Sequence, residues 1–416
     1  MNPLKIRNDF PIFKSHRDKP LVYLDNAATT HKPQVVIDAI TNFYTHAYAT
    51  VHRTLYPMGE AATTSYEAVR DKVARFINAK DRCEIIFTKG TTESINFIAQ
   101  AWALQAIKPG DQVLVGSIEH HANLVPWQEV ARATGASIVY LPLNPITYQF
   151  DNPEAYLSPK TKLVAVAHSS NVLGNVWNEG THQLENFIKT AHTLGARVLV
   201  DAAQSVAHQK IDVQTLDADF LAFSGHKMFA PTGVGVLYIK KELHDTVQPY
   251  QVGGSMIWEV TYQGASWAKA PQKFEAGTPP IAAVIGLGAA IDYIDGHITF
   301  DQLRIHEAAL CKQLIDGLLA IDGVTIIGNL ASLATAGHLV CFAIKDIHTH
   351  DLASLLAQDG IAVRAGHHCA QPFVSSLDTS SLIRVSVTAY NTPQDIELFL
   401  QACTHALNLL KSALIL

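Results

Sequence analysis

The stretch between residues 84 and 239 alternates short apolar runs with amphipathic segments, and this alternation constrains the fold more than any other feature of the chain. The runs are almost continuously apolar, which is typical of strands buried on both faces. Strands that alternate with helices form a largely parallel sheet with helices on both sides. We therefore expect an α/β fold with a seven-stranded sheet, its strands at 84–88, 112–116, 137–142, 162–167, 197–201, 219–224 and 234–239.

The order of elements changes after about residue 295, and a chain of 416 residues exceeds what one hydrophobic core usually supports. A helix at 301–320 precedes the strand "HLVCFAI", the helix "HDLASLLAQDG", the strands "IAVRAG" and "SLIRVSVTAY", and a last helix that opens with "TPQD". That opening combines a threonine cap, a proline and an acid, which is a helix-start signal. We predict a large domain at 17–294 and a smaller α+β domain at 295–416, with an N-terminal arm (1–16) packing near the smaller one.

The composition and charge exclude several classes of function. A net charge of −6 gives no electrostatic footprint for nucleic acid or a membrane surface. The start, "MNPLKIRNDFPIF", lacks the apolar core of a signal peptide, and no segment approaches the roughly 18 apolar residues of a spanning helix. The five cysteines form no C-x-x-C pair, which favours reduced thiols. We expect a cytoplasmic enzyme that binds neither nucleic acid nor membrane.

Polar residues at the predicted strand ends suggest an anion site, because ligands of open parallel sheets bind beyond the carboxyl ends of the strands. The strand at 84–88 leads into "KGTTES", where free helix amides with Thr91 and Thr92 would cradle a phosphate. Ordinary N-capping by threonine is the alternative. The strand at 219–224 delivers Ser224, His226 and Lys227 to the same edge.

Other strand ends offer partners for a planar ring. His120, the first histidine of "EHHAN", could stack on a ring or move protons, although a loop histidine is the alternative. The strand at 162–167 leads to Asn171. The strand at 197–201 ends in Asp201, a carboxylate that needs a partner when buried, and Gln204 follows it.

Lys227 adds a candidate nucleophile to this set of residues. A lysine among small and apolar neighbours loses solvation, which favours its neutral, nucleophilic amine. An anion cradle, a ring partner, a buried acid and an amine together fit pyridoxal 5'-phosphate, which requires a lysine for a Schiff base and an acid at its ring nitrogen. We therefore predict that Lys227 binds this cofactor covalently. A solvated lysine in a strand connection is the alternative.

The chain also resembles the Csd/Suf-type (group II) cysteine desulfurases, in particular their CsdA-like branch, within the class V aminotransferase group of fold type I. The matching stretches cover nearly the whole chain: "YLDNAATT", "VHR", "GTTESIN", "EHHANLVPW", "SNVLG", "VDAAQS", "FSGHK", "PTGVGVLY", "EAGTP", "RAGHHCAQP" and "YNT". Two positions depart from the family pattern. Val252 replaces the first glycine of a Gly-Gly-Gly-x-Met motif, and Pro280 replaces the asparagine after "EAGTP".

The resemblance implies a role for each site residue. Lys227 would hold the cofactor, Asp201 its ring nitrogen and Gln204 its phenolic oxygen, and His120 would stack on the ring. The phosphate would be held by Thr91, Thr92, Ser224 and His226. Thr278 would reach the phosphate of a partner subunit, which implies a homodimer. Arg384, with Asn171 and Arg364, would bind the substrate carboxylate. The alternation of "LIRVSV" independently places Arg384 on the polar face of its strand.

Cys369 differs from the apolar-patterned Cys311, Cys341 and Cys403, because it lies in a loop, "RAGHHCAQP". Positive groups nearby (Arg364, His367, His368) would favour a thiolate. An unremarkable loop thiol is one alternative. A metal site is another, built from His367, His368, Cys369, His348 and His350, but these lack the fixed spacing of zinc motifs, so we expect no metal.

A thiol such as Cys369 beside the cofactor favours desulfuration of cysteine over transamination. In a cysteine desulfurase, Lys227 removes the α-proton of L-cysteine, the thiolate of Cys369 takes the sulfur as a persulfide, and alanine leaves. Catalytic residues would then be Lys227, Cys369 and His120, with His120 exchanging a proton at the sulfur. The resemblance implies a SufE/CsdE-like acceptor protein, and activity on selenocysteine and cysteine sulfinate. The alternatives are another class V enzyme such as an aminotransferase, or a cofactor-free metal-binding or sulfur-carrier scaffold.

Overall fold

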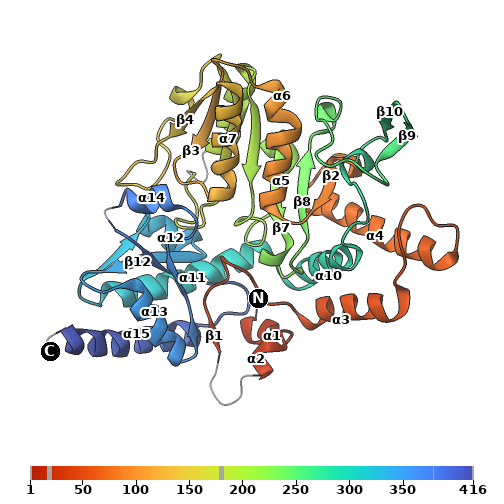
Figure 1. Cartoon of the computed structure of the whole chain (residues 1–416). Coiled ribbons are helices and arrows are strands. Elements are labelled where there is room, and N and C mark those ends of the chain that lie inside the picture. Colours follow the sequence, from red (N-terminus) through yellow and green to blue (C-terminus); the bar gives the residue numbers. More distant parts are fainter. Residues whose placement is uncertain (1, 16–20, 178–181, 378, 415–416) are drawn as a thin grey trace.

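The computed structural model describes residues 2–15, 21–177, 182–377 and 379–414. It contains two main sheets, one of seven strands and one of four, each associated with its own helices (Figure 1). The predicted boundary between the N-terminal arm and the large domain, at residues 16 and 17, lies outside the described residues. The division of the chain into two domains stays a prediction.

The large sheet has the order β2-β8-β7-β6-β5-β3-β4. Strand β8 runs antiparallel to both of its neighbours, and the other pairings are parallel, so the sheet is mostly parallel as predicted. The strands begin and end within one residue of the expected runs: β2 Ile85–Thr88, β3 Gln112–Gly116, β4 Ser137–Leu141, β5 Thr161–Ala167, β6 Arg197–Asp201, β7 Phe220–Ser224 and β8 Gly235–Ile239.

Both faces of this sheet are buried, which explains its continuous apolar strands. Val113 and Val115 of β3 belong to one hydrophobic cluster, while Leu114 between them belongs to another on the opposite face. Helix α10 packs against α3 and α4 below the sheet in Figure 1. The helices of this part are α3 Gln34–Asn42, α4 Pro57–Phe76, α5 Thr91–Ile98, α6 Leu104–Ala106, α7 Val125–Thr134, α8 Gln183–Thr193, α9 Val213–Leu216 and α10 Ile281–His297, and a hairpin joins β9 Ile257–Thr261 to β10 Gly264–Trp267.

The smaller sheet is antiparallel, with the order β11-β12-β15-β14. The sequence patterns missed its edge strand β11 and joined two short strands, β13 and β14, into one. The last helix begins as predicted, because Thr392 Oγ1 accepts from the amide of Asp395, and Asp395 Oδ2 accepts from the amide of Thr392 at 2.9 Å. The elements are α11 Phe300–Leu319, β11 Val324–Ile327, α12 Leu330–Ala336, β12 Leu339–Ile344, α13 Thr349–Gln358, β13 Ile361–Ala362, β14 Arg364–Gly366, α14 Gln371–Ser375, β15 Leu382–Ser386 and α15 Pro393–Leu414.

The N-terminal segment joins the two parts of the molecule. Helices α1 (Pro3–Arg7) and α2 (Ile12–Ser15) lie beside the smaller part, where Arg7 pairs with Asp395. Strand β1 (Val22–Tyr23) then pairs in parallel with β13, and Asp25 bridges to Ser386 of β15. Residues 22–25 therefore make strand contacts with the smaller part, although the predicted range 17–294 includes them. Their apolar residues, Val22 and Leu24, are buried in the same hydrophobic cluster as the strands of the smaller sheet.

In the part of the chain that the structure describes, no single helix is long and apolar enough to cross a membrane. Helices α10 and α11 reach that length only as a pair, and they are bent by 84° at the break between them. Residues of both helices are buried in the hydrophobic cores described above.

Candidate active site

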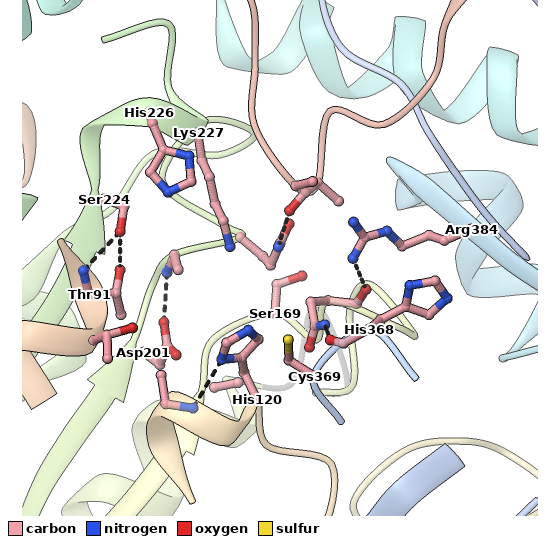
Figure 2. Close-up of a pocket in the computed structure, with 18 of the residues that line it drawn as sticks. Thr91, His120, Ser169, Asp201, Ser224, His226, Lys227, His368, Cys369 and Arg384 are labelled. Carbon is pink, nitrogen blue, oxygen red and sulfur yellow. Dashed lines mark hydrogen bonds between the residues drawn. The ribbon is translucent and has the colours of Figure 1, made fainter. Parts of the chain in front are cut away.

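A cavity of about 260 Å³ lies at the carboxyl ends of the central strands, where the sequence places its candidate residues. In Figure 2, Thr91 and Ser224 lie at one end, Arg384 lies at the other, and Lys227 lies between them. The cavity is lined by all the predicted site residues except Thr278: Thr91, Thr92, His120, Asn171, Asp201, Gln204, Ser224, His226, Lys227, Arg364, Cys369 and Arg384. The structure thus brings together groups that are as much as 293 positions apart in the sequence.

One end of the cavity is built to bind an anion. Helix α5 begins at Thr91, whose backbone amide and hydroxyl both contact Ser224 Oγ, at 2.8 and 2.7 Å. The first amides of a helix lack partners within the helix and attract negative charge. Thr92 and His226 line the same end, and burial lowers the pKa of His226 to about 4, so its ring is neutral. The hydroxyls, amides and imidazole here form a donor set that suits a phosphate.

Lys227 follows β7 in a single turn of 3₁₀ helix and faces the cavity. Its side chain is only partly exposed. Burial therefore lowers the pKa of its amine to about 8, against the opposing charge of Asp201. A larger fraction of the amine is neutral near neutral pH than at an exposed lysine. This is the property that covalent bonding to an aldehyde requires.

The lowered pKa of Lys227 predicts a pH profile. In cofactor-free protein, reductive methylation of Lys227 by formaldehyde should accelerate as the pH rises, because only the neutral amine reacts. The rate should level off above about pH 8, whereas exposed lysines should continue to accelerate toward their ordinary pKa of about 10.4. Peptide-resolved mass spectrometry across pH 6 to 11 measures both. A profile for Lys227 that coincides with that of the exposed lysines would contradict a desolvated amine.

Asp201, Gln204 and His120 surround the middle of the cavity. Burial raises the pKa of Asp201, although the amide of Ala203 donates to its Oδ1 at 2.9 Å and Lys227 is nearby. A buried carboxylate of this kind is stabilised by a cationic ring N–H. The side chain of Gln204 lines the cavity and donates to Ala27 O at 2.9 Å. The ring of His120 accepts at Nδ1 from the amide of Ala122 at 3.0 Å, which leaves Nε2 as the protonated nitrogen.

The other end of the cavity is a carboxylate site. Arg384 is buried on β15, as the alternation of that strand predicted, with Ile383 and Val385 in the opposite core. Its guanidinium donates to Asn171 O at 3.0 Å and to Asp25 Oδ1 at 3.1 Å. A planar guanidinium has further N–H groups to offer, which suits a carboxylate. Arg364 lines the same end. Sequence reasoning missed Asp25, although it lies in the quoted motif "YLDNAATT".

Glu119 is a second residue that sequence reasoning missed. It is buried directly before His120, where its carboxyl accepts from the amide of Ala167 at 2.9 Å and from the Asn123 side chain at 2.7 Å. Burial raises its pKa to about 8. Gly116 makes room for it, because a Cβ there would lie 2.3 Å from Glu119 Oε1. Glu119 is the first residue of the quoted motif "EHHANLVPW", and that motif is the sequence signal that could have found this support of the His120 loop.

Cys369 lies in the cavity wall, in the loop between β14 and α14. Figure 2 shows its sulfur on the same side of the cavity as His120. His368 does not support a thiolate as its sequence position suggested. Its ring is buried, burial lowers its pKa to about 3, and Nε2 contacts Leu382 O at 3.2 Å on β15. Among the described residues, no group of three or more His, Cys, Asp and Glu side chains could hold a metal ion.

Thr278 is the one predicted site residue that does not reach this cavity. It is exposed and does not line the cavity of its own chain. The two departures from the family pattern, Val252 and Pro280, lie in the same region, and both are exposed. A role for Thr278 at the phosphate of a partner subunit therefore stays a prediction.

The residues present fit pyridoxal phosphate in size and chemistry. A phosphate cradle, a buried acid, an imidazole and a desolvated amine occur in one cavity, which is the donor set that the cofactor needs. Fold and site together define a pyridoxal-phosphate enzyme of fold type I.

Comparison with known proteins assigns the family. The model of the aminotransferase class-V family matches residues 22–399, and the chain belongs to this family. A probable cysteine desulfurase of Halalkalibacterium halodurans is 46% identical over 95% of this chain and 96% of its own length. A cysteine desulfurase of Salmonella agona is 41% identical over 98% of each chain. The crystal structure of the cysteine desulfurase CsdA from Escherichia coli superposes with a TM-score of 0.89, at 40% identity over 98% of this chain and 99% of that chain.

Proposed function

We propose that this protein is a pyridoxal-phosphate-dependent cysteine desulfurase, which converts L-cysteine to L-alanine and keeps the sulfur as a persulfide on Cys369. The observation that carries the proposal is the position of a thiol, Cys369, in the same cavity as the Lys227 amine and the Arg384 guanidinium. A transaminase of the same fold needs the amine and the guanidinium but has no use for the thiol. The similarity to cysteine desulfurases over nearly the whole chain supports the same reaction.

The residues of the cavity divide the work. Arg384 and Asn171 hold the substrate carboxylate at one end, which directs the amino group and side chain toward Lys227 and Cys369. Thr91, Thr92, Ser224 and His226 would hold the cofactor phosphate and Asp201 its ring nitrogen, and the bound cofactor would supply an electron sink for the substrate α-carbon. The amine of Lys227, neutral in part near pH 8, removes the α-proton.

Cys369 and His120 act at the substrate sulfur. The Cys369 thiolate attacks that sulfur, so an S–S bond forms as the C–S bond breaks, and the carbon skeleton keeps the electron pair and leaves as alanine after protonation. The neutral ring of His120 carries its proton on Nε2 and lines the cavity, where this N–H can donate a hydrogen bond to the substrate sulfur. Burial and the charge of Lys227 lower its pKa to about 4, so it stays neutral over the working pH range.

The test of this function is product analysis. Purified protein loaded with pyridoxal phosphate should release alanine from L-cysteine and, under a reductant, one sulfide for each alanine. The visible absorbance of the bound cofactor should shift when L-cysteine is added. Transfer of the amino group to a keto acid, without sulfide, would identify an aminotransferase instead. A colourless protein that binds no cofactor and holds zinc would indicate a metal-binding scaffold.

Asp25 provides a prediction for the carboxylate site. Asp25→Asn should raise the KM for L-cysteine roughly tenfold, since it removes one charge-assisted hydrogen bond that orients Arg384, and should change kcat less. Steady-state kinetics measures both constants. The Arg7–Asp395 pair, also 3.1 Å long, supplies the control, because Asp395→Asn should lower the melting temperature and leave KM unchanged. Equal KM values for Asp25→Asn and wild type would contradict the orienting role.

We further propose that the protein works as a homodimer. Support comes from exposed apolar side chains on the β9–β10 hairpin, where Trp258 is 80% exposed and Val260 and Tyr262 are also exposed. Such side chains are costly in water unless a partner covers them. Light scattering should give about twice the 45.3 kDa of one chain, and Trp258→Ser with Tyr262→Ser should weaken association. A stable monomer at micromolar concentration would refute the proposal.

We also propose a SufE/CsdE-like protein as the sulfur acceptor and the cytoplasm as the compartment. A persulfide on Cys369 must pass to another nucleophile, and the resemblance to Csd/Suf-type enzymes favours a SufE/CsdE-like acceptor protein. Five free cysteines, three of them buried, favour the reducing cytoplasm. Sulfide release with and without a purified acceptor of this type would measure the transfer. An acceptor that fails to accelerate release would remove that class of partner.

A further inference from the structure

The loop that carries Cys369 is attached to the large domain through three backbone groups. The carbonyl of Cys369 accepts from the backbone amide of His121 at 2.7 Å. The amide of Gln371 donates to Nε2 of the His121 ring at 3.1 Å. The side chain of Asn171 donates to the carbonyl of His368. Two of these three contacts therefore come from His121, a residue to which the mechanism above assigns no role.

The loop needs such contacts because its backbone is unfavourable by itself. His368 and Cys369 both have positive φ angles, 53° and 56°, in the left-handed region that non-glycine residues seldom adopt. Two consecutive residues in this region persist only where surrounding contacts hold them. In this conformation the Cys369 side chain lines the cavity.

The ring of His121 also supports the helix that follows the loop. Gln371 is the first residue of α14, so its amide has no acceptor within the helix. The ring nitrogen of His121 supplies that acceptor from another part of the chain. An accepting Nε2 must be unprotonated, which agrees with the lowered pKa that burial and the nearby His367 give to this ring.

We propose that His121 is a positioning residue for Cys369, holding the loop and the start of α14 so that the thiol faces the cavity. The two neighbouring histidines then have different tasks. His120 lines the cavity itself, whereas the ring of His121 lies 6.3 Å from that of His120 and belongs to an adjoining groove. This inference deepens the proposed function, since a displaced thiol would slow only the step that uses it.

The test breaks the hydrogen bond between the Gln371 amide and His121 Nε2 in two ways, by removing either the acceptor or the donor. His121→Ala deletes the ring acceptor, and Gln371→Pro deletes the amide donor at the first residue of α14. Hydrogen exchange of the peptide around 365–374 and alkylation of Cys369 by iodoacetamide should both accelerate, roughly 3- to 10-fold for one lost hydrogen bond. The double variant should be no faster than either single variant, because both changes break the same contact.

A conservative variant and a second substrate separate positioning from loss of structure. His121→Gln keeps an acceptor oxygen and should restore slow alkylation. In turnover, His121→Ala should slow persulfide formation from L-cysteine and leave alanine release from cysteine sulfinate near the wild-type rate. Unchanged exchange and alkylation in His121→Ala, or additive effects in the double variant, would overturn the inference. Exchange and alkylation are measured on cofactor-free protein without substrate, so they decide the inference even if the proposed function fails.

Discussion

Replacing Lys227 with alanine is expected to abolish turnover of L-cysteine while the protein stays folded. The loss has two sources, because the variant lacks both the amine that bonds the cofactor and the base that removes the α-proton. Loss of a positioned base alone costs on the order of 10²- to 10⁴-fold in rate. The side chain faces a cavity, so its removal leaves the hydrophobic cores intact. Alanine release and thermal melting, measured together, check both parts of the expectation.

The attachment site of the cofactor can be located directly. Reduction of the loaded wild-type protein with borohydride, followed by peptide mapping, should place the pyridoxyl group on Lys227. Lys32 is a demanding control, because burial lowers its pKa to about 8 as well. Its Nζ, however, donates to the carbonyl of His226 at 3.1 Å and does not line the cavity. A pyridoxyl group on Lys32, or on any other lysine, would refute the assignment.

The sequence predicted the large sheet well because its strands are buried on both faces. Burial of that kind produces uninterrupted apolar runs, and all seven were placed to within one residue. The missed strand β11 lies at the edge of the smaller sheet, where only Ile327 of its four residues is buried. An edge strand therefore carries a weaker pattern. The run "IAVRAG" divides because β13 pairs with β1 while β14 pairs with β15, which a single continuous pattern cannot reveal.

Part of the candidate site could also be predicted from the sequence, because of how parallel strands are arranged. Parallel strands deliver the residues after their carboxyl ends to one edge, so Asp201, Ser224 and Lys227 could be grouped from local sequence alone. Contacts between residues far apart in the sequence could not be predicted in this way. Asp25 and Arg384 pair across 359 positions, and no local pattern indicates such a contact. The same holds for His121, whose role depends on a loop 250 positions away.

Replacing Cys369 with alanine is expected to abolish desulfuration of L-cysteine and formation of the persulfide, while cofactor binding is retained. The phosphate partners Thr91 and Ser224 and the Asp201 carboxylate come from other elements than the Cys369 loop, so the visible spectrum of the loaded variant should match that of wild type. Cysteine sulfinate and selenocysteine have better leaving groups or weaker bonds to carbon, and they need less help from a thiol. The variant should therefore keep much of its activity on these two substrates. Alanine release from all three, at matched cofactor occupancy, measures this selectivity.

The selectivity distinguishes a nucleophile from a structural thiol, because destabilisation lowers activity on every substrate alike. Cys83 is the matched control, since it too is only partly buried, but burial raises the pKa of its thiol to about 11 and it lies outside the cavity. Cys83→Ala should leave all three activities unchanged, and Cys83 should carry no persulfide after turnover. Equal losses on the three substrates in Cys369→Ala, or an unaffected reaction with L-cysteine, would exclude Cys369 as the sulfur acceptor and leave the aminotransferase alternative as the better explanation of the cavity.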